Sequence, residues 1–598
     1  MPGKPFSGKQ KKKQLQERRE KKKGTHGVYD DDDVQEVGQT TSGDGDQGQA
    51  EILRVHQQPT SSKDFDPNRY RLHFLKVSPE EMKKRKAAAR KPVIKVAEKD
   101  LEMSVESIHV KEPSLDFPKR PPWDFTLSKQ QLEKQERSYF QEYVHSILTS
   151  HDAERLSYFE LNLETWRQLW RVIEISDILL LIADIRHPVL HLPPSLYKYL
   201  REELRRDVVI VLNKVDLVPP GLTAAWRVYL NSVFPEAHIV CFASVPAVSE
   251  ETGTGFHHKQ KKRSVKPLGP QELLDMCKEF VKEKVNLESW QHKVDTRDIS
   301  TSAPDKHDHE ESVAPGNQPN SQSQTGAAGI GYGVYQRFRD GILTIGCIGY
   351  PNVGKSSLLN GLVGRKVVSV SKTPGHTKHL QTIFLTPTVR LCDCPGLVFP
   401  SYVDKSLQIL SGIFPIAQVR EPYSAVGYLA QRLDLPRVLH LLHPDVVAKK
   451  HVPQDNKDLV WSAYDMCEGW AMKYGYFTAK AARPDTYRAA NHILRLAVEG
   501  RLRLCYAPPG YFDEKETWKT DPFATSLTER LEKQAKFGSS VAQPEDSMSE
   551  SDSDGNQDAQ STGSGSDGDS EGENIRDQRV RRHKHAVDRN PFALLSDH

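Results

Sequence analysis

The chain has 598 residues, a length that suggests several domains. Charged residues make up 27% of it and hydrophobic residues only 37%, which excludes a chain folded throughout and predicts long disordered stretches. The net charge is only +3, the seven cysteines show no paired framework, and no apolar run approaches the ~20 residues of a membrane helix. We therefore expect a soluble intracellular protein with no membrane partner.

Residues 1–120 are predicted to be disordered, first basic and then acidic. Lysine runs at 9–13 and 21–23 precede four aspartates at 30–33, and no apolar periodicity here could build a core. The same lack of an apolar stretch argues against a signal peptide. Dense lysine runs are typical of nuclear import signals and of RNA contacts. We expect nuclear import receptors as partners and residence in the nucleus or nucleolus, with shuttling to the cytoplasm left open.

Residues 121–250 are predicted to form a helical lead-in and the first half of an α/β domain. Apolar residues at helical spacing indicate the helices, and continuous apolar runs are typical of parallel strands buried on both faces. A helix between two such strands completes a βαβ unit. The expected elements are helices at 128–148, 162–175 and 194–205 and strands at 178–184, 207–213 and 238–242.

The rest of the chain alternates between polar and apolar segments. One amphipathic helix is expected at 270–290, within a polar insertion, and one strand at 343–349. The final segment is rich in Ser, Asp, Glu and Gly, which predicts disorder and phosphorylated serines, and it ends with a second basic run. The predicted segments are a largely disordered insertion at 251–332, the second half of the α/β domain at 333–400, a helical domain at 401–530 and a disordered tail at 531–598.

The clearest motif is a phosphate-binding loop that follows the strand at 343–349 and starts a helix. Its glycines let the backbone wrap a phosphate with the N–H groups pointing inward, and the helix N-terminus favours negative charge. Lys355 is placed to reach the β and γ phosphates, and the hydroxyl of Ser356 to ligate Mg²⁺. The residues predicted to bind nucleotide here are Gly349, Asn352, Val353, Gly354, Lys355, Ser356 and Ser357.

An Asp-x-x-Gly motif formed by Asp393 and Gly396 follows a strand expected at 388–392. An Asp at a strand end can hold Mg²⁺ through water, and the N–H of Gly396 can contact the γ-phosphate. Thr377 lies in a glycine-containing loop between the two motifs and is our choice to complete the Mg²⁺ shell, with Thr373 as the alternative. The predicted catalytic residues are Lys355, Thr377 and Gly396.

Base recognition is predicted from Asn213, Lys214 and Asp216, which follow a buried strand. The Asp216 carboxylate can accept two hydrogen bonds from guanine, where adenine has no matching donors. Lys214 can lay its alkyl stem along the base, and Asn213 can hold the loop. Ala243 and Ser244 end the next strand and can offer a backbone N–H to guanine O6. GTP and GDP are therefore the predicted ligands.

The order of these motifs is circularly permuted, because in an ordinary GTPase the phosphate loop precedes base recognition. With Asp-Ile-Arg-His-Pro at 184–188 and Thr-Trp-Arg-Gln-Leu-Trp at 165–170, this order resembles the circularly permuted GTPases of ribosome assembly, in particular their large-subunit branch. The resemblance covers about 125–525. It implies a permuted P-loop GTPase domain, a parallel sheet with flanking helices, followed by a mainly helical domain. It also implies rRNA or the large ribosomal subunit as partner.

Two positions bear on the mechanism. Leu397 stands directly after the Asp-x-x-Gly motif, where Ras-like enzymes place the Gln that orients the attacking water, so we expect slow hydrolysis. In related GTPases an Asn at the position of Asn352 helps to bind K⁺, so the resemblance implies a K⁺ site that stimulates hydrolysis. The alternative is that Asn352 only shapes the turn.

The helical domain interleaves aromatic and cationic residues, which can stack bases and track phosphates. The alternative is an ordinary aromatic core under a solvated basic face. Because the Asp-x-x-Gly loop leads almost directly into this domain, loss of the γ-phosphate is expected to reorient it.

The predicted function is a GTP-binding switch that hydrolyses GTP slowly with Mg²⁺ and acts on a ribonucleoprotein, in large-subunit biogenesis. Two alternatives stay open. One is a regulatory GTPase that acts on protein partners in proliferation or signalling, and the other is a scaffold in which nucleotide binding only stabilises the fold. The sequence names neither the activating partner nor the oligomeric state.

Overall fold

The structure is a computed structural model, and it describes the following parts of the chain. They are Leu72, Phe74 and residues 79–109, 115–124, 126–152, 155–244, 267–299, 336–371, 374–375, 377, 380–447, 459–479 and 482–540. The basic and acidic runs of the first 71 residues, most of the insertion, Thr373 and the tail beyond 540 lie outside these described residues.

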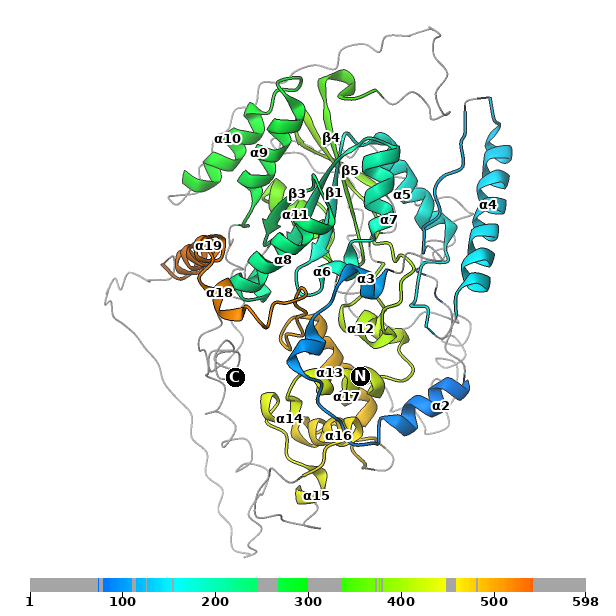
Figure 1. The fold of residues 1–598 in the computed structure, drawn as a ribbon, viewed down its shortest axis with the longest axis vertical. Coiled ribbons are helices and arrows are strands. Elements are labelled where there is room, and N and C mark those ends of the chain that lie inside the picture. Colours follow the sequence, from blue (N-terminus) through cyan, green and yellow to red (C-terminus); the bar gives the residue numbers. More distant parts are fainter. Residues whose placement is uncertain are drawn as a thin grey trace, which may run out of the picture. The chain divides into compact units, whose positions relative to one another are not determined.

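A six-stranded sheet, in the order β3-β2-β1-β4-β6-β5, forms the centre of the structure (Figure 1). All neighbouring pairs are parallel except β5 with β6. The parallel sheet expected from the sequence is confirmed, and β5, which was not predicted, adds an antiparallel edge to it. The strands are β1 (Ile178–Asp184), β2 (Asp207–Asn213), β3 (His238–Phe242), β4 (Leu343–Gly349), β5 (Gln381–Thr386) and β6 (Val389–Asp393).

The strand order reverses between β1 and β4. From β1 the chain moves outward through β2 to β3, and from β4 it moves the other way to β6 and β5. Right-handed crossovers therefore place the helices that follow β1 and β2 on one face and those that follow β3 and β4 on the other. Figure 1 shows α5 and α7 to one side of the strands and α9 and α10 to the other. A ligand is expected outside the carboxyl ends of β1 and β4, at this reversal.

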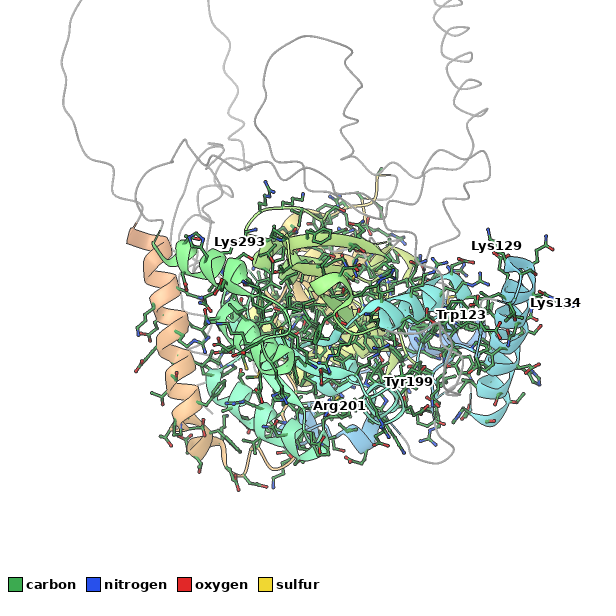
Figure 2. All side chains as sticks on the ribbon, turned by 90° about the horizontal axis from the view of Figure 1, so that it is seen from above. Trp123, Lys129, Lys134, Tyr199, Arg201 and Lys293 are labelled. Atoms are coloured by element: carbon green, nitrogen blue, oxygen red, sulfur yellow. The ribbon has the colours of Figure 1, made fainter. Side chains whose placement is uncertain are left out.

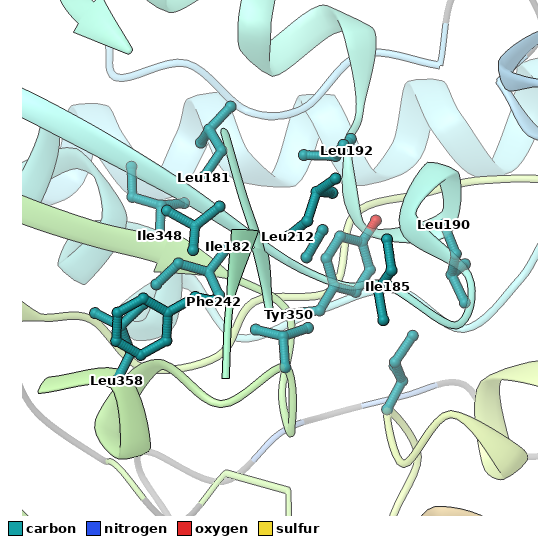
Figure 3. Close-up of a cluster of buried hydrophobic side chains, with 14 of the residues drawn as sticks. Leu181, Ile182, Ile185, Leu190, Leu192, Leu212, Phe242, Ile348, Tyr350 and Leu358 are labelled. Atoms are coloured by element: carbon teal, nitrogen blue, oxygen red, sulfur yellow. The ribbon is translucent and has the colours of Figure 1, made fainter. Parts of the chain in front are cut away.

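Apolar side chains fill the space on both faces of the sheet, which explains the continuous apolar runs. Every residue of β1 is buried, and so are all but the first of β2. Figure 3 shows Ile182, Leu212, Phe242 and Ile348 within this core, beside Tyr350 of the phosphate loop. The core therefore extends to the base of the nucleotide motifs.

Helices surround the sheet as the apolar spacing predicts. The expected helix at 194–205 is shorter, because α7 gives way to a π-helical turn, η2. The flanking helices are α4 (Lys129–Ser150), α5 (Leu163–Ile175), α6 (Pro188–His191), α7 (Pro194–Lys198), η2 (Tyr199–Glu203), η3 (Val215–Leu217), α8 (Pro220–Val233), α9 (Pro270–Val281), α10 (Glu288–Ile299), η4 (Arg339–Gly341) and α11 (Lys355–Val363).

The chain after β6 is helical, and α16 and α17 pack against each other at its centre. Ser462 caps α16 by accepting the N–H of Asp465. The helices are α12 (Lys405–Leu410), η5 (Ile416–Gln418), α13 (Tyr423–Arg432), α14 (Leu435–Val438), α15 (Pro444–Val447), α16 (Ala463–Tyr474), α17 (Thr486–Val498), α18 (Lys515–Lys519) and α19 (Pro522–Ser540). Because α19 runs to Ser540, the tail expected from 531 begins later than predicted.

The N-terminal prediction is wrong for residues 79–109, which contain α2 (Pro79–Ala88), η1 (Glu98–Leu101) and α3 (Val105–Ile108). This segment lies along the helical domain through backbone hydrogen bonds. The N–H of Val93 donates to Trp461 O at 2.9 Å, and the N–H of Met103 donates to Ala507 O at 2.8 Å. Such long-range bonds leave no periodic signal in the sequence.

The peripheral helix α4 and the two helices in the predicted insertion, α9 and α10, complete the fold. Trp123 lies between α4 and the rest of the structure, whereas Lys129 and Lys134 of α4 are exposed (Figure 2). The single helix expected at 270–290 is two helices, α9 and α10, because Lys282 ends α9 in a left-handed conformation. None of the helices within the described residues has the length and apolar character to cross a membrane.

Candidate nucleotide-binding site

The phosphate loop follows β4 and is held by the protein's own groups. Gly354 adopts a φ of +99°, and a Cβ there would lie 2.3 Å from the Asn213 side chain, so only glycine fits. The Lys355 ammonium donates to the carbonyls of Gly349 at 2.9 Å and Tyr350 at 2.8 Å. Burial lowers the pKa of Lys355, although Asp393 opposes this effect. The Lys355 side chain thus spans the phosphate loop and bonds to the carbonyls on its far side.

The three predicted Mg²⁺ ligands converge at the first turn of α11. Ser356 Oγ donates to Asp393 Oδ2 at 2.8 Å and lies 3.4 Å from Thr377 Oγ1. Burial raises the pKa of Asp393 to about 6, against the lowering influence of Lys355. The other carboxylate oxygen, Oδ1, is buried and has no hydrogen-bond partner among the described residues. A hard cation prefers such oxygen donors, so these residues fit Mg²⁺.

An open pocket lies beside these ligands. Both glycine-bearing loops reach it. Gly396 lies against Pro351, where a Cβ would meet the proline backbone at 2.7 Å. The N–H of Leu397 donates to Gly349 O at 3.2 Å, which joins the two loops. The cavity is lined by Pro351, Asn352, Gly354, Lys355, Ser356, Ser357, Ser369, Val370, Ser371, Gly375, Thr377 and Gly396.

The predicted base-recognition loop contacts the phosphate loop directly. Asn213 Nδ2 donates to Val353 O at 2.8 Å, and Lys214 Nζ donates to Asn352 O at 2.6 Å. Asp216 lies in η3, two residues after Lys214. The structure thus brings together two motifs that are more than a hundred residues apart in the chain.

The loop after β3 corrects one predicted contact. The N–H of Ala243 donates to Leu268 O at 3.2 Å, so it is not free for guanine O6. Ser244 lies beside the base-recognition loop, with its hydroxyl 3.4 Å from Asn213 Oδ1. The guanine O6 contact therefore stays a prediction for Ser244 alone.

A buried ion cluster at the end of β1 was missed as a functional feature. Asp184 is 1% exposed and accepts from Arg186 Nε at 3.0 Å and Nη2 at 2.8 Å, and from Lys214 Nζ at 2.7 Å. Burial opposes its charge, but Arg186 and Lys214 together hold the pKa of this carboxyl well below its ordinary value. Arg186 also donates to Ala497 O in the helical domain, at 3.0 Å. The sequence signal for this cluster was an Asp and an Arg at the end of β1, the strand that pairs with the strand before the base-recognition motif.

The chain that leaves the Asp-x-x-Gly motif is buried rather than exposed. Leu397 and Phe399 are each 1% exposed, and Phe399 packs edge-on against Trp166 of α5 with ring centroids 5.3 Å apart. The N–H of Glu160 donates to Val398 O at 3.0 Å. This segment then continues into α12, so the loop of the Asp-x-x-Gly motif is tied both to α5 and to the helical domain.

Comparisons with known proteins agree with this geometry. Residues 344–445 match the model of a family described as "50S ribosome-binding GTPase". The human guanine nucleotide-binding protein-like 1 is 48% identical over 542 residues, which cover 88% of each chain, and the mouse protein is 48% identical over 543 residues with the same coverage. The chain belongs to the guanine nucleotide-binding protein-like 1 family.

More distant relatives extend the comparison beyond the guanine nucleotide-binding protein-like 1 family. The mouse large subunit GTPase 1 homolog is 31% identical over 443 residues, 66% of each chain. Among solved structures, GNP-bound YlqF from T. maritima aligns with 13% identity and a TM-score of 0.30, covering 57% of this chain and 97% of that one. The family membership shows a GTP-binding protein with a circularly permuted P-loop GTPase domain, and the sheet order displays that permutation.

Proposed function

We propose that this protein is a slow, Mg²⁺-dependent GTPase that acts as a switch on the maturing large ribosomal subunit. The observation that carries the proposal is the convergence of Ser356, Thr377 and Asp393 beside the phosphate loop. The element that follows Asp393 along the chain is α12, which belongs to the helical domain. Bound Mg²⁺ would neutralise phosphate charge there. The ribosomal target is supported by the family model's description and by the name of the large subunit GTPase relative.

The slow rate is supported by the environment of Leu397. Its side chain is aliphatic and 1% exposed, so it can neither orient a water nor reach the cavity without moving. Hydrolysis then depends on positioning and on the charge of Lys355 and Mg²⁺. Slow hydrolysis suits a switch whose lifetime is set by a partner.

K⁺ stimulation is supported by the position of Asn352. This residue has a φ of 59° and lines the cavity, and its Nδ2 donates to Gly412 O at 2.8 Å. The amide nitrogen thus faces the helical domain, and the amide oxygen is the atom that would bind K⁺. Hydrolysis measured in KCl should exceed hydrolysis in NaCl of equal concentration.

RNA contact is supported by the outer surface of α16, α17 and the loop between them. Tyr474 is 48% exposed and Phe477 52% exposed. Arg488 lies over the partly buried Tyr476 ring at 4.3 Å, and Lys473 lies 5.6 Å from the ring of Trp470, which is itself buried. Exposed rings beside cations can stack bases and bind phosphates. We propose this face as the rRNA-binding surface, and nuclear or nucleolar residence through the basic runs outside the described residues.

The test is co-sedimentation of the full-length protein with large ribosomal subunits at physiological salt. We expect retention with a non-hydrolysable GTP analogue and release with GDP, and the variant Lys355→Ala should lose this dependence. Release in both states would overturn the ribosomal target and favour a switch that acts on protein partners. Equal retention in both states would overturn the switch, because the charged tails would then bind RNA regardless of nucleotide.

A further inference from the structure

Helix α5 contacts both segments that bracket the predicted γ-phosphate site. Gln168 on this helix is 2% exposed, and its Oε1 accepts the N–H of Leu380 at 3.1 Å. Leu380 lies three residues after Thr377 and directly before β5. Trp166 of the same helix packs against Phe399, which follows the Asp-x-x-Gly motif. One helix therefore holds the ends of both loops.

The helix that carries Gln168 is itself fixed to β4, the strand that leads into the phosphate loop. Gly346 of β4 lets α5 approach so closely that a Cβ there would lie 2.3 Å from Ser176 Oγ and 2.8 Å from Val172 Cγ1. A buried ion pair holds the outer side of α5, where Arg167 Nε donates to Glu136 Oε2 at 2.7 Å. Gln168 is thus placed on a rigid support relative to the phosphate loop.

We propose that Gln168 is a positioning residue for the GTP-bound state, because it fixes the end of the Thr377 loop relative to the phosphate loop. The inference rests on the proposed role of Thr377 as a Mg²⁺ ligand. The span between Thr377 and Leu380 is only three residues, so an anchor at Leu380 limits how far the Thr377 hydroxyl can move from Ser356. GDP lacks the γ-phosphate that helps to hold Mg²⁺, so a fixed position of the Thr377 hydroxyl is expected to matter less when GDP is bound.

The Gln168 amide has a second feature that favours a functional role. Its Nε2 is buried and has no hydrogen-bond partner among the described residues. A buried unpaired donor is costly, and an aliphatic side chain of the same size would avoid that cost. Met or Leu would avoid that cost but would leave the Leu380 N–H without this acceptor. The retained amide is explained by its acceptor oxygen, which an aliphatic residue cannot supply.

The experiment compares four full-length variants with the wild type. Gln168→Met keeps the volume and removes the acceptor, whereas Gln168→Glu keeps an oxygen that can accept from Leu380. Gln135→Met is the matched control, because Gln135 is an exposed residue of α4. Thr377→Ala tests the role on which the inference rests. Affinities for GDP and for a non-hydrolysable GTP analogue with Mg²⁺ are measured by calorimetry, and hydrolysis under single-turnover conditions.

We expect Gln168→Met to lower analogue affinity and hydrolysis about tenfold, with GDP affinity within about twofold of the wild type. Gln168→Glu should restore most of the loss, and Gln135→Met should match the wild type. If Gln168→Met does not fold, Gln168→Asn replaces it, since its amide is one methylene too short to reach Leu380. Equal loss for GDP and the analogue, or a Glu variant no better than Met, would overturn the inference.

The parallel variant separates this inference from the proposed function. The compared quantity is the ratio of the affinity for the GTP analogue to the affinity for GDP, called here the preference for the analogue. If this ratio falls in Thr377→Ala but not in Gln168→Met, only the role of Gln168 is overturned. If both variants keep the wild-type preference, the assignment of Thr377 as a Mg²⁺ ligand is overturned as well.

Discussion

The two halves of the nucleotide site are built differently. On the base side, Lys214 is already paired with Asp184 and with the carbonyl of Asn352, and Asn213 is bonded to Val353. On the phosphate side, Asp393 keeps one buried oxygen without a partner among the described residues, beside an open cavity. Internal contacts thus hold the base-recognition loop and also Lys355 of the phosphate loop, whereas Asp393 still offers a carboxylate oxygen to a ligand.

This difference indicates which part of the site is expected to change shape between GTP and GDP. A site whose groups are already satisfied gains little by changing shape between GTP and GDP. A site with unmet oxygen donors gains from Mg²⁺ and the γ-phosphate, so their loss shifts its equilibrium. Both sides reach the helical domain, through Arg186 to Ala497 and through the chain from Phe399 into α12. Only the second of these connections is expected to respond to hydrolysis.

The largest effect is expected from breaking the base-side cluster. Asp184→Asn removes the charge that neutralises the buried Arg186 and Lys214, so we expect a loss of about 3–5 kcal/mol in the free energy of unfolding. Urea denaturation measures it. The control is Asp207→Asn, because Asp207 pairs with Arg201 and Arg337 near the surface and should cost below about 1 kcal/mol. Equal costs for both variants would contradict a preorganised base side.

The next effect sharpens the contrast on the phosphate side. Lys355→Ala removes the charge expected at the β and γ phosphates, so hydrolysis should fall by about 10²–10³. Its cost in unfolding free energy should be smaller than that of Asp184→Asn. Single-turnover hydrolysis measures the rate, with the exposed Lys366→Ala on the loop after α11 as control. Wild-type hydrolysis by Lys355→Ala would contradict the assignment of the phosphate loop.

Base choice can be tested by exchanging one atom of Asp216. In Asp216→Asn one carboxylate oxygen becomes an NH₂ group, which cannot accept from the guanine amino group. We expect GTP affinity to fall about 100-fold, since hydrogen bonds to charged groups are the stronger ones. Xanthosine triphosphate carries a carbonyl at that position and should bind this variant better than GTP does. Unchanged GTP affinity in a calorimetric titration would show that another residue selects the base.

Some elements of the fold and of the nucleotide site could be predicted from the sequence, and others could not be predicted. The bounds of β1, β2, β3 and β4 were predicted, those of β1 and β2 because their continuous apolar runs reflect burial on both faces. The nucleotide motifs were predicted because phosphate and guanine each demand particular residue types. The N-terminal segment was misjudged because its hydrogen bonds reach Trp461 and Ala507, far along the chain. The roles of Asp184 and Gln168 depend on partners that only the fold brings near.

The smallest effect concerns His109, which ties the N-terminal segment to the base side. Burial lowers the pKa of His109 from 6.5 to about 4, although its hydrogen bond to Val189 O opposes this effect. The imidazole ring is therefore uncharged in the folded protein at neutral pH. The unfolded chain therefore binds more protons between these pH values, and stability falls as pH falls from 6.5 toward 4. We expect a loss of about 1 kcal/mol per pH unit from this residue.

The variant His109→Gln checks this expectation, since Gln keeps a donor for Val189 O and does not titrate. The difference between wild type and variant in unfolding free energy should shrink as the pH is lowered from 7 to 5. A difference independent of pH would mean that His109 has the same pKa in the folded protein as in the unfolded chain.

The most direct test of the central claim is hydrogen–deuterium exchange of the full-length protein with GDP and with a non-hydrolysable GTP analogue, both with Mg²⁺. We predict that peptides covering residues 178–218 exchange alike in the two states. Peptides covering 374–411, which include Thr377, Asp393 and α12, should be more protected with the analogue. Equal protection of 374–411 in both states, or a change confined to 178–218, would contradict the account.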